Sequence, residues 1–240
     1  MKAMSDLSVN IIKLLSVTLS RDKQVQLEHD FKTYSDAVNY AIKSIMKRRI
    51  PTPAKAEQLL FDDTANRFMA RPIGESEGGD LSTFGRRFKY SMIADLIPKQ
   101  IKVASEEHGL VVIDRTPEDL RREFAQEYAG QYVKDVIRSA AAEISRHRKL
   151  AKTLISIRGK VPHFKYDTLI LSGMLVDVDE KAVEVLTLSG EGVPIPFDKR
   201  SRNRELEILQ NISQQRKKHE RVRLILNKEG FLNIDIRIRK

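Results

Sequence analysis

The hydrophobic pattern of this chain changes its period once, near Leu154, and this change constrains the fold more than any other feature. Before it, over residues 21–153, apolar residues recur every three or four positions, which is typical of helices with one buried face. After it, apolar and polar residues alternate, which is typical of strands in a half-buried sheet. Residues 8–20, rich in Val, Ile, Leu and Thr, predict one strand or two short ones before the first helix. The order predicts an α+β fold, in which an α-helical lobe interrupts a β-barrel.

The ends of the predicted elements follow from capping and turn residues. Pro51 ends the first helix, and the dipeptide Thr116-Pro117 opens the last one. The predicted helices span residues 21–49, 55–69, 81–97 and 116–152. The predicted later strands span residues 154–158, 168–171, 174–178, 182–188, 193–197, 221–227 and 231–239, with a helix or long loop at 206–212. The last two strands form a hairpin with one apolar face and one basic, solvent-exposed face.

Charge is distributed unevenly along the 240 residues. Residues 134–165 carry nine basic and two acidic side chains, residues 166–198 carry one and seven, and residues 199–240 carry thirteen and five. The net charge is +10. Two basic blocks around an acidic one favour a face that meets polyanions such as nucleic acid. The alternative is a basic protein whose lysines are only solvated.

Composition excludes several other classes of function. The chain has no cysteine, which removes disulfides, thiol nucleophiles and cysteine-bound metal sites. The five histidines are too far apart for a local metal motif, so no metal and no cofactor is predicted. Because no apolar run approaches about 18 residues, no membrane-spanning helix and no membrane contact is predicted. Without a signal peptide either, the predicted location is cytoplasmic.

Three stretches carry a resemblance to a known family. The first is the strand and helix of Leu15–Met46, with Tyr34 and the pair Val38-Asn39 at its centre. The second is GKVPHFKYD, residues 159–167, and the third is the closing hairpin RVRLILNKEGFLNIDIRIR. Together, and in this order, they resemble the N-terminal half of TnpB, the RNA-guided nuclease of insertion sequences, which is related to type V CRISPR effectors.

The resemblance implies a domain organisation and a function. It implies a wedge-like barrel at residues 1–20 and 151–240, with a recognition-like helical lobe at 21–150. In the family a RuvC nuclease domain follows the hairpin, and here the sequence stops before one. The expected function is therefore to hold a guide-like RNA, and also a short DNA motif, without cutting, so that the chain by itself is not an enzyme. Asp235, on the last strand, is interpreted as a solvent-facing residue and not as a catalytic acid.

Two alternatives stay open. The chain could be the non-catalytic half of a split or truncated RNA-guided endonuclease, with RuvC on another chain. It could also be a protein-interaction module whose helical lobe docks a partner.

Candidate binding residues are cations for phosphates and flat groups for bases. Residues 158–166 mix both kinds, which suits RNA or a single strand. Phe164 either stacks on a base or plugs the barrel, and Asn39 either reads an adenine edge or bonds a neighbouring loop. Tyr34 is predicted to lie in the core. The predicted nucleic-acid-binding residues are Asn39, Arg86, Arg87, Lys89, Arg146, Arg148, Lys149, Lys152, Arg158, Lys160, Phe164, Lys165, Arg200, Arg202, Arg204, Arg216, Lys217 and Lys218.

Overall fold

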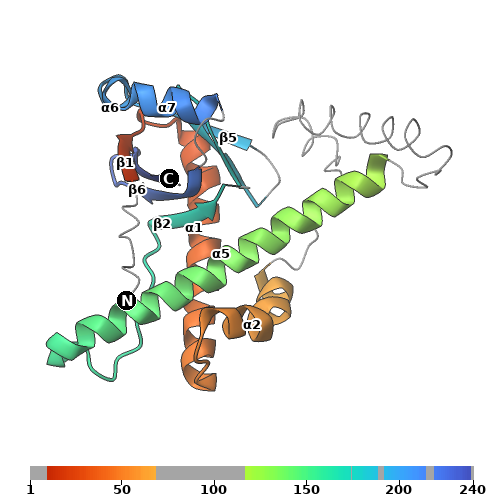
Figure 1. The fold of residues 1–240 in the computed structure, drawn as a ribbon, viewed down its shortest axis with the longest axis vertical. Helices are drawn as coiled ribbons and strands as arrows, with labels where there is room; N and C mark the ends of the chain where they lie inside the picture. Colours follow the sequence, from red (N-terminus) through yellow and green to blue (C-terminus); the bar gives the residue numbers. More distant parts are fainter. Residues whose placement is uncertain (1–9, 69–116, 174, 189–191, 215–218, 239–240) are drawn as a thin grey trace, which may run out of the picture.

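The computed structural model describes residues 10–68, 117–173, 175–188, 192–214 and 219–238 (Figure 1). Helices and strands are both present, which confirms the α+β class. The helices are α1 (Arg21–Arg48), α2 (Pro53–Phe68), α5 (Pro117–Thr153), α6 (Lys199–Arg204) and α7 (Leu206–Ser213), with a 3-10 turn, η1, at Ile155–Ile157. The strands are β1 (Asn10–Leu15), β2 (Thr168–Ser172), β3 (Val176–Val178), β4 (Ala182–Leu186), β5 (Gly192–Pro196), β6 (His219–Leu226) and β7 (Leu232–Ile238).

The larger sheet has four antiparallel strands in the order β1-β7-β6-β2, so the closing hairpin is its centre. Ile234 of β7 pairs with Leu14 on one side and Leu224 on the other, and Ile236 lies between Ile12 and Val222. All six side chains are buried. The predicted alternation of the hairpin is therefore confirmed, because one face of each strand packs in the core.

The smaller sheet has the order β3-β4-β5, and among the described residues it meets the larger one at a single bridge, Ser16 to Phe197. Around this bridge, Val17 donates to the Pro196 carbonyl at 3.0 Å. In a strand the nitrogen and the carbonyl of one residue point to the same side, and residues two apart share that side. The nitrogens of Pro194 and Pro196 therefore face β1, and proline has no N–H to donate. The edge of β5 therefore cannot form a full ladder with β1, and no closed barrel is found among the described strands.

Helices α1 and α5 cross each other and pack on the larger sheet at β2 (Figure 1). The predicted apolar stripe of α1 is buried, including Leu27, Phe31 and Val38. The stripe of α5 is buried at Val136 and Ile137, and its predicted part at 120–128 lies outside the side chains that the structure describes. These side chains belong to the same hydrophobic cluster as those of both sheets. The helices and strands thus share one core, and the predicted division at residues 20 and 150 stays a prediction.

Tyr34 connects this core to the strands through its hydroxyl group. The side chain is fully buried, and its hydroxyl donates to the Ile170 carbonyl of β2 at 2.7 Å. Its oxygen lies 2.8 Å from the Ser139 hydroxyl of α5. Burial raises the pKa of Tyr34 well above its usual value, so the group stays neutral. Asp135 of α5 adds a second link by accepting the Ser172 N–H at 2.7 Å.

Two predicted elements need correction or comment. The predicted strand at 154–158 is wrong, because the chain forms η1 there. Arg158 donates to the carbonyls of Ala151 at 2.8 Å and Lys152 at 3.1 Å, so its guanidinium caps α5 and turns the chain back. The predicted helix at 81–97 lies outside the described residues.

Over the described ranges, no helix has both the length and the apolar character that crossing a membrane requires.

Candidate nucleic-acid interface

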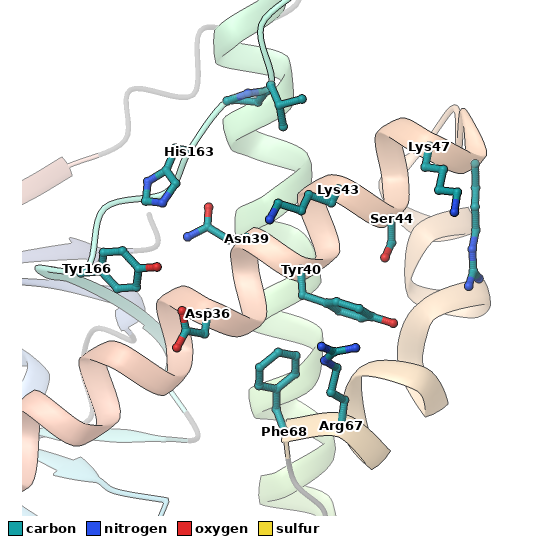
Figure 2. A pocket seen from close by; sticks show the side chains of 13 residues that line it. Asp36, Asn39, Tyr40, Lys43, Ser44, Lys47, Arg67, Phe68, His163 and Tyr166 are labelled. Carbon is teal, nitrogen blue, oxygen red and sulfur yellow. The ribbon is translucent and has the colours of Figure 1, made fainter.

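An open groove of about 870 Å³ lies between α1, the end of α2 and the extended segment 161–166 (Figure 2). We call it the α1 groove, and we call residues 161–166 the strap. Four cations line the groove: Lys43, Lys47, Arg48 and Arg67. Four rings line it as well: Tyr40, Phe68, His163 and Tyr166.

The floor of the α1 groove is the solvent-facing side of α1. Asp36, Tyr40, Lys43 and Lys47 follow one another at steps of three or four residues, so they share one helical face. The buried stripe of α1 occupies the opposite face, and this fixes the direction of the polar side. Lys43 and Lys47 are both exposed. One face of a helix thereby presents two exposed cations beside a tyrosine ring.

Arg67 and Phe68 of α2 form one wall of the groove beside Tyr40, as Figure 2 shows. The Tyr40 hydroxyl donates to Asp63 at 2.6 Å, and its ring lies 5.7 Å from that of Phe68. The Arg67 guanidinium carbon lies over the Tyr40 ring, 4.6 Å from its centroid. This distance is within the range of a cation–π contact. Arg48 approaches the same Asp63 carboxylate at 3.4 Å.

The opposite wall is the strap. The rings of His163 and Tyr166 lie 5.4 Å apart at an interplanar angle of 56°. Tyr166 is 50% exposed. A hydrogen bond to the Asp36 carboxylate, together with the charge of that group, raises the pKa of Tyr166. The Asp36 carboxylate on the floor is thus hydrogen-bonded to Tyr166 on this wall.

The path of the strap is fixed by α1 through main-chain atoms. The Asn39 side chain accepts the Phe164 N–H at 2.8 Å and donates to the Phe164 carbonyl at 3.1 Å. Ser35 donates to the Lys165 carbonyl at 2.9 Å. The Asn39 amide is therefore bonded to the neighbouring loop, the second of the two roles foreseen for it, and is not presented to a base edge in this structure.

The strap separates its residues by face. Pro162 and Phe164 point inward and are buried, whereas His163, Lys165 and Tyr166 are exposed. Phe164 is only 6% exposed and meets the Tyr34 ring edge-on at 5.9 Å. Phe164 is accordingly a core residue, and its predicted stacking on a base does not fit this position.

A second groove, of about 260 Å³, lies between α5, β2 and β6. We call it the sheet groove. Its cations are Arg146, Lys165, Arg221 and Arg223, of which the first two were predicted. His163 lines both grooves, so both cavities border the strap. Arg146 is also paired with Glu143 at 2.6 Å.

The other predicted cations do not gather in these two grooves. Lys149, Lys152 and Lys160 are exposed around the end of α5. Arg200 and Arg204 line a separate groove of about 470 Å³ beside β1. Two of the predicted residues bond main-chain carbonyls: Arg158 caps α5, and Arg204 donates to the Lys13 carbonyl at 2.8 Å. Arg148 lines a small cavity with α2. Within the described residues, the buried Nε of Arg202 has no hydrogen-bond partner. Arg86, Arg87, Lys89, Arg216, Lys217 and Lys218 lie outside the described residues.

Several groove residues were missed from the sequence. Lys43 and Lys47 lie on the polar face of a predicted helix, and their spacing with Tyr40 is the signal that could have identified them. Arg221 and Arg223 lie on the basic face of the predicted hairpin. Arg67 gave no local signal, because its role depends on the packing of α2 against α1.

Within the described part of the chain, no three His, Cys, Asp or Glu side chains are grouped so that they could hold a metal ion. Asp235 is half-buried, and its carboxylate lies 3.8 Å from Arg223.

A scan against protein-family models finds no family that matches this chain. A search of curated proteins finds no match either, so the geometry of the two grooves is the basis on which function is argued.

Proposed function

We propose that this chain is an RNA-binding protein that holds a guide-like RNA without cutting it. The observation that carries the proposal is the α1 groove, in which cations and exposed rings line one cavity. Phosphates need cations, and unpaired bases need flat surfaces. A cavity that offers only one kind of group would favour a small anion or an apolar ligand instead.

The charges of the two grooves support a polyanion as ligand. The α1 groove and the sheet groove each contribute four lysines or arginines, and His163 lines both. The nearby acids are engaged: Asp36 bonds Tyr166, and Asp63 accepts from Tyr40 and Arg48. Cations in both grooves beside one strap fit an extended chain of phosphates better than a single nucleotide.

The architecture fits a TnpB-like arrangement as a proposal. The two sheets, bridged just after the ends of β1 and β5, would correspond to the wedge domain, and α1, α2 and α5 to the beginning and end of the recognition lobe. The α1 groove lies where helices and strap meet, which is where this arrangement would place nucleic acid. A short DNA motif as a second ligand, and a separate chain that carries RuvC, belong to the same proposal.

The test is to purify the intact chain from its host and to sequence the RNA that copurifies. We expect one enriched, structured RNA, bound with an affinity that falls steeply as salt rises. Mixed cellular RNA with a flat salt response would contradict the proposal. Copurification of protein without nucleic-acid absorbance would favour a protein-interaction module, and a copurifying chain with a RuvC sequence would favour a split nuclease.

A further inference from the structure

We propose that the α1 groove takes an unpaired stretch of RNA and that the Arg67 guanidinium, positioned by Tyr40, is the platform on which one of its bases stacks. This inference rests on the proposed RNA binding and specifies the form of the ligand. Stacking on an arginine plane requires a base that is not enclosed in a duplex. The groove therefore selects single-stranded over double-stranded RNA.

The position of Arg67 is prepared before any ligand arrives. Tyr40 is fixed at its hydroxyl by Asp63, at 2.6 Å, and at its ring by Phe68, at 5.7 Å. The Arg67 guanidinium lies over that ring, and the residue is exposed to the groove. No carboxylate among the described residues forms an ion pair with Arg67. A planar cation that is supported on one side and exposed to the groove is suited to a base, because less conformational entropy is lost when the base binds.

The surroundings of Arg67 match a single strand. Tyr166 and His163 line the opposite wall and offer further ring surface for a neighbouring base. Lys43 and Lys47 stand on the floor, about 6 Å apart along the helix axis. Rings on two sides with cations between them are the arrangement of single-strand grooves, where base stacking and backbone charge act together.

The competing explanation is that Arg67 contacts a phosphate as an ordinary cation. The two explanations differ in what lysine can replace. Lysine keeps the charge but has no plane, so it serves a phosphate and cannot serve as a stacking platform. Arg67→Lys therefore separates them, and Arg67→Ala measures the whole contribution of the side chain.

The experiment measures equilibrium binding of a fluorescently labelled, unstructured oligouridylate and of a blunt RNA duplex of the same length. The proteins are the intact wild type, Arg67→Lys, Arg67→Ala and the control Lys181→Ala. Lys181 is exposed and lines neither groove. Its replacement by alanine also removes one positive charge, which matches the charge change in Arg67→Ala. Thermal unfolding of each variant confirms that it is folded.

We expect Arg67→Lys to weaken oligouridylate binding by at least about fivefold, which is most of the loss in Arg67→Ala. Lys181→Ala should bind like the wild type, and the duplex should bind more weakly than the single strand. Wild-type binding by Arg67→Lys, or tighter binding of the duplex, overturns the inference while RNA binding itself stands. If the wild type binds neither RNA, the inference is overturned, and the sequencing of copurified RNA decides the proposed function separately.

A second pair of variants keeps the test decisive if the Arg67 variants do not fold. Tyr166→Ala removes the ring on the opposite wall, and Tyr166→Phe keeps it while removing the hydroxyl that meets Asp36. Loss of single-strand binding in the first but not the second supports stacking in this groove. Equal binding by both, at the wild-type level, overturns it.

Discussion

Replacing Asp30 by asparagine should stabilise the protein at neutral pH. Asp30 lies on the buried side of α1, with 4% of its surface exposed, and accepts the Leu188 N–H at 3.0 Å. His29 approaches it at 3.5 Å. Burial raises the pKa of Asp30 from 3.8 to about 6, and its two hydrogen-bond partners offset only part of this effect. Asparagine keeps an oxygen for the Leu188 N–H and carries no charge.

The sign and size of the effect follow from proton linkage. Because the folded pKa exceeds the unfolded one, the folded state binds more protons between about pH 4 and pH 6. The free energy of unfolding therefore falls as pH rises through that range. One pKa unit corresponds to about 1.4 kcal/mol, so the ionised Asp30 costs up to about 3 kcal/mol at neutral pH. Roughly half of this cost develops between about pH 5 and pH 8.

Urea unfolding followed by circular dichroism measures this difference. The gain in unfolding free energy of Asp30→Asn over the wild type should grow between about pH 5 and pH 8. Glu28→Gln, an exposed change on the same helix, is the control and should show no such growth. A gain that stays constant with pH, or a loss that grows with pH, would refute the argument that a buried charge is the cause.

Two further predictions concern the strap and the groove floor. Asn39→Ala removes both hydrogen bonds to the Phe164 main chain and should lower the unfolding free energy by about 1–3 kcal/mol, measured by urea unfolding. An unchanged value would show that the strap is held by other contacts. The double variant Lys43→Ala/Lys47→Ala should reduce the slope of log affinity for single-stranded RNA against log salt by roughly 1.4, measured by salt titration of binding. A slope equal to that of Lys181→Ala would exclude both lysines from the phosphate path.

The parts of the fold that could be predicted are those that local sequence determines. The ends of α1 follow from its periodicity and from Pro51, and the faces of β7 follow from strict alternation. The pairing of β1 with β7 could not be predicted, since it joins residues at opposite ends of the chain. The predicted barrel overlooked Pro194 and Pro196, whose missing N–H groups leave the β5 edge without a full ladder.

The candidate site was harder to predict, because its residues come together only through packing. The sequence shows that residues 158–166 mix cations and rings, but it could not decide that Phe164 lies in the core and Tyr166 at the surface. Composition shows that arginines are abundant, but not that Arg67 lies over Tyr40. Such a contact depends on how α2 packs against α1, which periodicity alone does not specify.

The strap has one consequence for how its ligand preference could change. Asn39 and Ser35 hold it through the main chain of Phe164 and Lys165, and those bonds do not depend on which side chains point outward. Positions 163 and 165 are therefore free to vary in charge and shape while the path of the segment is preserved. Mutational libraries at these two positions offer a way to retune recognition while leaving the scaffold intact.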